Sequence, residues 1–388
     1  MRIAIFTNTY WPTVNGVAVS IANLRDGLER TGHEVYVFAP APPDFDLEED
    51  DERTIRFPSV LAPIEADYPL AVPISPRVGK TLRKLDFDLI HTHHPVWVGV
   101  WGQWYARWTD TPLVTTVHTQ YEIYSKFIPL PHSVVDAFLR VRVSSYCNKC
   151  DIVTTPAVSS RQRLLDLGVT TPIEVVYNPT DLSAHSHADG QAVRRRFGFG
   201  ADDVVLGYVG RLAPEKNLNM LMDAMELLSA QDPRLRLLLV GDGPSREGLE
   251  ARVATGALAG KVAFAGNVDH ADVPTYDAAL NIFITASMSE VQPLSFAEAM
   301  AAGAPVVAMD SPGGSDMIED HRNGRLVPPG EAGAGMARCV REMLADPATL
   351  PKMSEEAKQW AQRYDKPAVV ERLLEVYDRA IVLAAKTE

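Results

Sequence analysis

The sequence predicts an α/β protein built from two domains that follow one another along the chain. Short apolar runs typical of buried strands alternate with stretches of helical spacing, first over residues 1–182 and again over residues 183–363. Strands and helices that alternate in this way form parallel sheets with helices on both faces. The chain has 388 residues, 46% of them hydrophobic, which is enough for each domain to have its own core.

In the first domain, Ile3–Phe6 is the first predicted strand, and a loop rich in turn formers follows it. Helical spacing over Val19–Thr31 predicts a helix that ends at Gly32, and Val35–Ala39 is the next strand. The pattern continues with further apolar runs at Leu89–Ile90, Leu113–Val117 and Ile152–Thr155.

The second domain is expected to begin after Asp181–Gly200, a polar segment interpreted as a linker. Five apolar runs predict its strands: Val204–Val209, Leu235–Val240, Val262–Phe264, Leu280–Ile284 and Val306–Ala308. Lys366–Lys386 is expected to be a helix whose apolar face needs a partner surface. The acidic run Asp44–Glu52 is expected to be a solvated loop.

Composition excludes several classes of protein. The balance of 37 Lys and Arg against 50 Asp and Glu gives a net charge of −13, which argues against a general nucleic-acid binder. Three cysteines cannot form a disulfide framework, which fits a reducing compartment such as the cytoplasm. Because no apolar run is long enough to span a bilayer, we expect a soluble or peripheral protein.

Two cations follow the strand Val204–Val209. Arg211 and Lys216 lie in a loop that leads into a helix, which Asn217 is placed to cap. Open parallel sheets bind ligands beyond the carboxyl ends of their strands. Two cations with backbone amides suit a diphosphate whose charge must be held as it leaves. The alternative is a solvated turn with surface charges.

Two carboxylates follow the strand Leu280–Ile284. Glu290 lies in the loop, Pro293 is expected to be the first helical residue, and Glu298 lies in the second turn. The free N–H groups of such a helix start favour an anion, and the two carboxylates could each accept hydrogen bonds from a pair of hydroxyls. For Glu298 the alternative is a surface residue of an amphipathic helix.

Histidines follow two strands of the first domain. His118 follows Leu113–Val117, and alternation places His91 and His93 on one side, where the three could chelate zinc. No cysteine or carboxylate clearly joins them, so no metal site is predicted. Two Asp-x-Asp patterns, Asp44-Phe45-Asp46 and Asp86-Phe87-Asp88, lie away from the carboxyl ends of the strands, and Cys147 and Cys150 have no second pair.

In their order and spacing, these motifs resemble glycosyltransferase family 4. The resemblance rests on Gly210-Arg211 with Glu215-Lys216-Asn217, Gly241-Asp242-Gly243-Pro244, Glu290 with Glu298, Gly303-Ala304-Pro305-Val306-Val307, and Gly314 with Asn323-Gly324. It implies the GT-B fold, with two Rossmann-like doubly wound domains facing a cleft. Residues 1–182 would bind the acceptor, joined by a crossover helix at 364–388, and residues 183–363 would bind the nucleotide-sugar.

The resemblance also assigns roles by position. Arg211 and Lys216 would hold the donor diphosphate, Glu298 the ribose hydroxyls and Glu290 the sugar hydroxyls. His118 would lie near the reaction centre and, with Glu290, Arg211 and Lys216, completes the expected catalytic set. Donor contacts are expected from Gly16, Arg211, Lys216, Asp242, Val268, Glu290, Gln292, Pro293, Leu294 and Glu298. The family retains anomeric configuration. Because no carboxylate here is an evident nucleophile, we expect front-side attack without a metal or other cofactor.

Within the family, two segments look most like the diacylglycerol glucosyltransferases: Asp88-Leu89-Ile90-His91-Thr92-His93-His94-Pro95 and His118-Thr119-Gln120-Tyr121-Glu122-Ile123-Tyr124. The expected reaction moves glucose from UDP-glucose to a lipid hydroxyl such as that of diacylglycerol. Pro293 stands where the family has glycine, which leaves a mannosyl- or other hexosyltransferase acting on a glycan or small molecule open. An inactive nucleotide-sugar-binding module is the second alternative.

A lipid acceptor implies contact with an anionic membrane. The stretch Ile123–Lys149 mixes apolar residues at helical spacing with cations, as interfacial helices do. The expected acceptor and membrane residues are Tyr121, Tyr124, Lys126, Arg140 and Arg142. The protein would then be peripheral on the inner face of the cell membrane. The alternative is that the apolar residues pack on the sheet and the cations are solvated.

Overall fold

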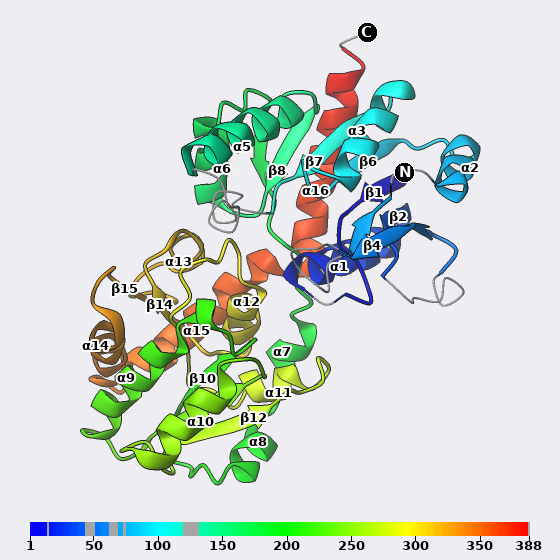
Figure 1. The fold of residues 1–388 in the computed structure, drawn as a ribbon. Coiled ribbons are helices and arrows are strands. Elements are labelled where there is room, and N and C mark those ends of the chain that lie inside the picture. Colours follow the sequence, from blue (N-terminus) through cyan, green and yellow to red (C-terminus); the bar gives the residue numbers. More distant parts are fainter. Residues whose placement is uncertain (14, 43–50, 62–68, 73–74, 119–131, 387–388) are drawn as a thin grey trace. The chain divides into compact units, whose positions relative to one another are not determined.

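The computed structural model describes residues 1–388 except 14, 43–50, 62–68, 73–74, 119–131 and 387–388 (Figure 1). The chain divides into two compact units, residues 1–179 with 366–388 and residues 180–365. The boundaries expected from the sequence lie two or three residues from these divisions. Among the described residues, no helix is both long enough and apolar enough to cross a bilayer.

The first unit is a parallel sheet with strand order β3-β2-β1-β6-β7-β8-β9 among the described residues. Its strands are β1 (Arg2–Phe6), β2 (Glu34–Pro40), β3 (Thr54–Phe57), β6 (Leu89–Thr92), β7 (Leu113–Thr116), β8 (Ile152–Thr155) and β9 (Ile173–Val175). β4 (Ser59–Leu61) and β5 (Pro69–Ala71) form a separate antiparallel pair. Its helices are α1 (Gly16–Arg30), α2 (Pro76–Lys84), α3 (Val98–Trp108), α5 (His132–Cys147), α6 (Val158–Asp166) and α16 (Lys366–Ala384).

Alternation along the strands gives this sheet two buried faces. On one face, Ile3 and Ile5 of β1 pack with residues of α1 and α16. On the other, Phe6 packs with residues of α3 and α5. Gly27 of α1 allows α16 to approach closely, because a Cβ there would lie 2.5 Å from Cγ2 of Val370. The C-terminal helix therefore belongs to the first unit and finds there the partner that its apolar face requires (Figure 1).

The second unit is a parallel sheet with strand order β12-β11-β10-β13-β14-β15 among the described residues. Its strands are β10 (Val204–Val209), β11 (Leu235–Val240), β12 (Val262–Gly266), β13 (Ile282–Thr285), β14 (Val306–Met309) and β15 (Gly324–Val327). The helices are α7 (Ser183–His187), α8 (Gln191–Arg196), α9 (Leu218–Ser229), α10 (Arg246–Thr255), α11 (Val273–Asp277), α12 (Leu294–Ala301), α13 (Pro312–Met317), α14 (Ala332–Leu344) and α15 (Thr349–Ala361), with 3-10 turns at Pro214–Lys216 and Gln362–Tyr364.

The predicted class, two parallel-sheet α/β domains, is confirmed, whereas several local predictions were wrong. Asp181–Gly200 is not a linker but contains α7 and α8, because His185 and Val193 are buried in the second unit. The strands β3, β9 and β15 were not predicted. Each is short and has a charged residue in its interior, Arg56, Glu174 or Arg325, so none gives a clear apolar run.

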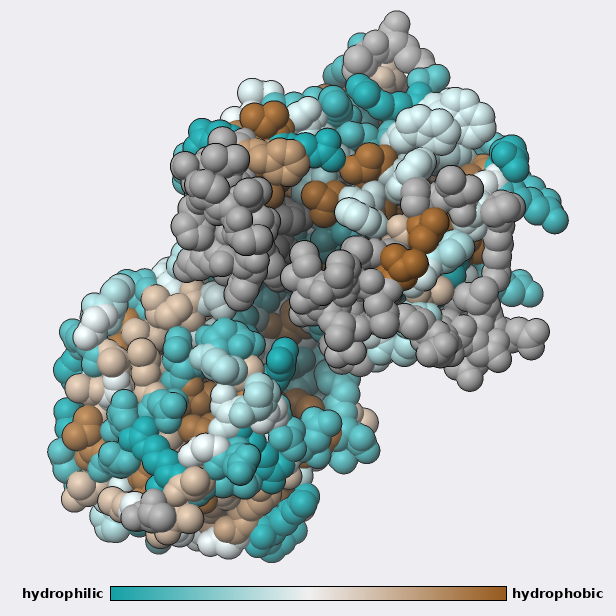
Figure 2. All heavy atoms as spheres, in the orientation of Figure 1, coloured by the Kyte–Doolittle hydropathy of each residue, from teal (hydrophilic) through white to brown (hydrophobic). Residues whose placement is uncertain are grey.

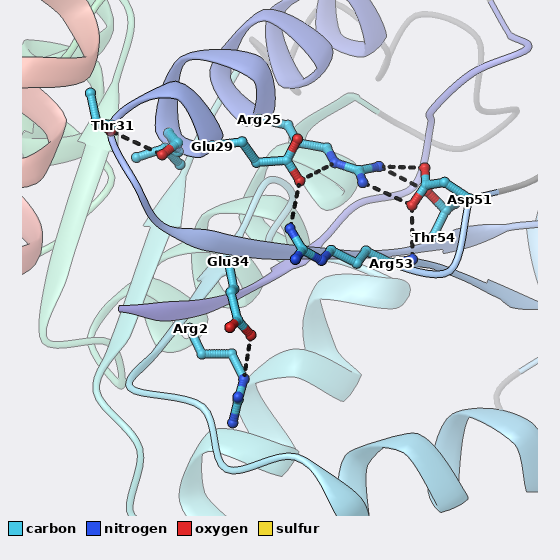
Figure 3. A network of polar contacts seen from close by, with 9 residues as sticks. Arg2, Arg25, Glu29, Thr31, Glu34, Asp51, Arg53 and Thr54 are labelled. Carbon is cyan, nitrogen blue, oxygen red and sulfur yellow. Dashed lines mark hydrogen bonds and ion pairs between the residues drawn. The ribbon is translucent and has the colours of Figure 1, made fainter.

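At the end of the acidic run, Asp51 and Glu52 are exposed, as expected of a solvated loop, but Asp51 also contacts α1. Residues 43–50 lie outside the described residues, but Asp51 accepts two hydrogen bonds from Arg25 of α1, each 2.8 Å long (Figure 3). Thr54 also donates to this carboxylate, and Glu29 pairs with both Arg25 and Arg53. Burial acts to raise the pKa of Asp51, but the hydrogen bonds from Arg25 and Thr54 outweigh it and lower the pKa to about 2.

Candidate active site

The strand order of the second unit creates a place for a ligand. β10 pairs with β11 on one side and with β13 on the other, so the chain leaves β10 and β13 in opposite directions from neighbouring strands. Open α/β sheets bind ligands at this kind of switch point, beyond the carboxyl ends of the strands. The loop after β10 carries Arg211 and Lys216, and the loop after β13 carries Glu290.

Glycines lock the loops after β10 and β11 together. Gly241 has φ +124°, and a Cβ there would lie 2.0 Å from the carbonyl oxygen of Gly210. The N–H of Leu212 donates to the carbonyl of Asp242 at 2.9 Å, and that of Ser245 donates to the carbonyl of Leu212. A side chain at Gly241 would force the two backbones apart. The glycines of the Gly210 and Gly241 motifs therefore hold the Arg211 loop in place.

Lys216 and Glu290 meet across the two loops. The Lys216 Nζ donates to Oε1 of Glu290 at 2.5 Å, and the Ser287 hydroxyl donates to the same oxygen at 2.8 Å. The Lys216 and Glu290 side chains are 22% and 23% exposed, so the pair is partly shielded but reachable. A partly shielded ion pair can open to admit a charged ligand, because each of the two side chains then forms a strong hydrogen bond to the ligand in place of the one that it loses. The structure thus brings together the cation and the carboxylate assigned to the diphosphate and the sugar.

The other predicted donor residues of the second unit lie in the loops after β10, β11, β12 and β13 and in α12. Arg211 is exposed, and its guanidinium makes no hydrogen bond or ion pair within the described part of the chain. The Asp242 carboxylate instead pairs with Arg246 at 2.7 Å and accepts the N–H of Gly243. Val268 and Leu294 are partly buried, and Gln292 and Pro293 are buried.

Two predictions about helix starts were wrong in detail. Pro293 is the residue before α12 rather than its first residue, and its ψ of 120° is extended. Asn217 precedes α9 with φ 52°, but its side chain makes no capping bond and donates to the carbonyl of Ala286 at 3.3 Å. Sequence shows which residue lies near a helix start, but the backbone torsions at that residue depend on the neighbouring loop.

Glu298 is not a surface residue of an amphipathic helix. It is 9% exposed on α12 and lies near His185 of α7 and Asp277 of α11, which form an ion pair at 3.1 Å. Burial, helped by the Asp277 charge and opposed by His185, raises the pKa of Glu298 to about 7. Burial also raises the pKa of Asp277, against the effect of His185. Burial lowers the pKa of His185, but the contact with Asp277 outweighs it and the net shift is upward.

Sequence reasoning missed His185, Asp277, Ser287 and the nearby Tyr208 of β10. His185 lay in the segment interpreted as a linker, and nothing in the sequence linked it to Asp277. Ser287 gave a clearer signal, because it follows β13 directly, as a ligand-binding residue of a parallel sheet does. Burial, with a contribution from the Glu290 charge, raises the pKa of the Tyr208 phenol, which therefore stays neutral.

The first unit has its own switch point between β1 and β6, and histidines gather at the carboxyl ends of β6 and β7. His93 Nδ1 and His118 Nε2 are 2.8 Å apart, and Asn8 donates its N–H to Nδ1 of His94. His91 contacts the Tyr377 hydroxyl of α16 at 2.8 Å and the Thr116 hydroxyl at 2.6 Å. Gly16, the first residue of α1, lies after β1 and is exposed.

Burial keeps these histidines neutral. It lowers the pKa of His91 to about 3 and that of His94 to about 4. Burial and then the neighbouring histidines hold the pKa values of His93 and His118 well below the usual range, against a hydrogen bond between His118 and Asn178. Within the described residues, no group of His, Cys, Asp or Glu is arranged to hold a metal ion. At neutral pH the His118 ring can exchange hydrogen bonds but carries no charge.

The discounted patterns serve structural roles where the structure describes them. Asp88 accepts the N–H of Arg2 at 2.6 Å, at the start of β1 and so away from the histidines, whereas Asp44–Asp46 lies outside the described residues. Cys147 and Cys150 are buried in the core, and burial raises the pKa of Cys147 to about 12.

The membrane prediction falls partly outside the described residues. Tyr121, Tyr124 and Lys126 lie there. Arg140 and Arg142 are exposed on α5. Phe138 and Val141 of the same helix are 62% and 64% exposed, so these two side chains do not pack on the sheet.

Models of known protein families match both units of the chain. Residues 14–184 match the family described as Glycosyltransferase Family 4, and residues 189–360 match Glycosyl transferases group 1. A GDP-mannose-dependent alpha-mannosyltransferase of Mycobacterium tuberculosis is 31% identical over 339 residues, 85% of each chain. Alpha-monoglucosyldiacylglycerol synthases of Streptococcus pneumoniae and Acholeplasma laidlawii are 29% and 28% identical, covering 84% and 94% of this chain and 75% and 94% of their own.

Solved structures share the fold at lower identity. HepE of Anabaena, solved in complex with UDP, superposes with a TM-score of 0.77 at 23% identity over 97% of this chain and 99% of its own. Sucrose-phosphate synthase of Thermosynechococcus elongatus gives a TM-score of 0.76 at 22% identity over 98% and 99%. The two Rossmann-like units have the GT-B fold of these structures, and the family matches identify the chain as a glycosyltransferase. The chain belongs to glycosyltransferase family 4.

Proposed function

We propose that the chain is a retaining, metal-independent hexosyltransferase that moves glucose from UDP-glucose to a lipid hydroxyl such as that of diacylglycerol. The observation that carries the proposal is the Lys216–Glu290 pair at the switch point of the second unit. There Lys216 and the exposed Arg211 bind the diphosphate, and Glu290 binds the sugar hydroxyls. Lys216 stabilises the charge that develops on the leaving phosphate, which is the largest electrostatic demand of the reaction.

Retention by front-side attack fits the surroundings of Glu290. Its Oε1 already accepts hydrogen bonds from Lys216 and Ser287, which suits a carboxylate that holds hydroxyls better than one that attacks carbon. The leaving phosphate then accepts the proton of the acceptor hydroxyl. Because His118 is neutral, we assign it a hydrogen-bonding rather than a charged role in the reaction. Because the cations neutralise the diphosphate, no metal is needed, and turnover should survive chelation of divalent ions.

Glucose and a lipid acceptor are supported by the relatives named alpha-monoglucosyldiacylglycerol synthase. The relative named GDP-mannose-dependent alpha-mannosyltransferase supports a second candidate, transfer of mannose. In either case the protein works peripherally at the cytoplasmic face of the membrane, with no role for nucleic acid. An inactive nucleotide-sugar-binding module would leave Lys216, Arg211, Glu290 and Glu298 without a reaction to perform.

A donor screen tests the proposal. The full chain would be incubated with UDP-glucose, UDP-galactose or GDP-mannose and a lipid extract, with and without a chelator, and products identified by mass spectrometry. We expect a glucosylated lipid from UDP-glucose. Mannosylated product would establish the second candidate. If the chain neither transfers nor hydrolyses any of the donors, the second alternative, an inactive nucleotide-sugar-binding module, is established.

A further inference from the structure

Three of the six tryptophans in the chain lie on one face of a single helix of the first unit, and a fourth precedes that helix directly. Trp101, Trp104 and Trp108 follow one another at spacings of three and four residues along α3, and Trp97 is the residue before its first turn. Trp97, Trp101, Trp104 and Trp108 are 49%, 37%, 59% and 58% exposed. The rings of Trp101 and Trp104 lie 6.3 Å apart, and those of Trp104 and Trp108 stack at 5.9 Å. We call this set the tryptophan stripe.

Close packing of the opposite face of α3 keeps the tryptophan stripe facing outward. A Cβ at Gly102 would lie 2.9 Å from Cγ of the Phe6 ring, and one at Gly99 would meet the carbonyl of His94. The Tyr146 hydroxyl donates to the carbonyl of Gly99 at 2.9 Å. Because Gly99 and Gly102 let the helix backbone approach the sheet closely, and Val98, Tyr105 and Ala106 are buried in the same core, the helix cannot roll to bury its tryptophans. The exposure is built into the packing.

The surroundings of the stripe are basic although the chain has a net charge of −13. Neither α2 nor α3 contains an acidic residue. α2 adjoins α3, since the Tyr105 hydroxyl donates to the carbonyl of Leu82 at 2.6 Å. The exposed cations of the two helices are Lys80, Arg83, Lys84 and Arg107. These four cations form a basic rim, although exposed Asp86, Asp88 and Asp110 lie in the loops that follow the two helices.

The neighbouring helix α5 extends this surface. α3 and α5 contribute to the same core on one face of the sheet, and Gln103 donates to the carbonyl of Tyr146 at 2.9 Å. α5 presents exposed Phe138, Val141, Arg140 and Arg142. Figure 2 shows hydrophobic and intermediate side chains among hydrophilic ones on this part of the surface. The helix layer therefore presents apolar and cationic side chains together.

We propose that the tryptophan stripe and its basic rim dock on an anionic lipid bilayer, a proposal that rests on the lipid acceptor of the proposed function. Indole rings settle at the boundary of headgroups and acyl chains, because they join a large apolar surface to one N–H donor. Cations at the rim attract anionic headgroups. A symmetric pair of chains is a poorer occupant, because it would bring the two basic rims together.

The position of the stripe within the first unit fits this role. Trp97 follows His94 by three residues, so the stripe starts at the carboxyl ends of the strands, beside the histidines. A bilayer held on the stripe would lie next to the edge of the sheet that carries His118. A lipid hydroxyl at the membrane surface could then reach that edge without leaving the bilayer.

Vesicle sedimentation of the full chain tests the surface. The vesicles would contain phosphatidylcholine with about one third phosphatidylglycerol, or phosphatidylcholine alone. The double variant Trp104→Ser with Trp108→Ser should bind anionic vesicles at least about tenfold more weakly, since two interfacial rings are lost. The matched control, Leu227→Ser with Val382→Ser, removes exposed apolar side chains elsewhere and should bind as wild type does. Equal binding by wild type and the tryptophan variant would overturn the proposal.

Two further measurements separate the stripe from the proposed reaction. Arg83→Glu with Lys84→Glu should weaken binding to anionic vesicles only. Transfer to short-chain diacylglycerol in detergent should survive in the tryptophan variant. If wild type needs the stripe to bind vesicles but glycosylates no lipid, the proposed acceptor fails and the docking surface stands. If sedimentation velocity shows a dimer that the tryptophan variant abolishes, and wild type ignores vesicles, the stripe joins two copies of the chain and the docking proposal fails.

Discussion

The Lys216 ammonium lies 2.5 Å from Oε1 of Glu290, and this pair joins the loop after β10 to the loop after β13. Each group keeps a partner of opposite charge until a donor arrives. A bound nucleotide-sugar would divide the pair, with its diphosphate taking Lys216 and its sugar hydroxyls taking Glu290. On the proposed function, the donor would therefore replace an existing contact rather than meet two isolated charges.

Removal of the Lys216 ammonium should cut turnover. We expect Lys216→Ala to lower kcat by roughly two or more orders of magnitude and to weaken binding of UDP, because a charge-assisted contact to a developing anion is lost. Steady-state kinetics and calorimetry of UDP binding would measure both. Lys352→Ala, an exposed lysine elsewhere in the second unit, is the control. Near-normal rates for Lys216→Ala would exclude Lys216 from the site.

The two carboxylates should separate sugar binding from nucleotide binding. Glu290→Gln keeps the side-chain shape but weakens the acceptor, so turnover of the nucleotide-sugar should fall much more than affinity for free UDP. Glu298→Ala should lower both, because ribose is common to the two ligands. Calorimetry with UDP beside kinetics with the full donor distinguishes the two patterns. Equal losses of UDP affinity in both variants would contradict the assignment.

The buried Glu298 should make stability fall as pH rises. Its pKa is about 7 in the folded chain against a usual 4.5, so between these values the folded state holds more proton than the unfolded state. The favourable contribution is complete below pH 4.5 and is lost as pH rises through about 7. Thermal unfolding between pH 5 and 8 should show a steeper loss for wild type than for Glu298→Gln, which cannot ionise. Parallel curves would show that Glu298 does not titrate in this range.

The carboxylate of Asp51 should stabilise the first unit with the opposite pH dependence. Its pKa is about 2 against a usual 3.8, so the contribution is present above pH 4 and is lost as pH falls toward 2. Because the Asp51 side chain is 52% exposed, solvent screening limits the effect, and Asp51→Asn should cost about 1 kcal/mol or less at pH 7. Denaturant unfolding would measure it, with exposed Asp269→Asn as control. A larger loss for Asp269→Asn than for Asp51→Asn would refute this ranking.

Sequence alone determined the architecture and the two charged residues at the centre of the candidate active site. Strand spacing predicted two parallel sheets, and the residues after two strands, Lys216 and Glu290, gave the charges that the structure brings together. These inferences succeed because the position and the end of a strand depend on the local sequence, where the apolar pattern shows them. The order of the motifs indicated the family for the same reason, since order and spacing are read directly along the chain.

Tertiary packing decided the rest. His185 and Asp277 are 92 positions apart in the sequence, and only the packing of α7 against α11 makes them a buried pair near Glu298. The outward direction of the tryptophan stripe likewise depends on Gly102 meeting Phe6, which no periodicity records. Burial and long-range contact set the pKa values and the exposed faces, and both arise from the three-dimensional neighbours of a residue rather than from those beside it in the chain.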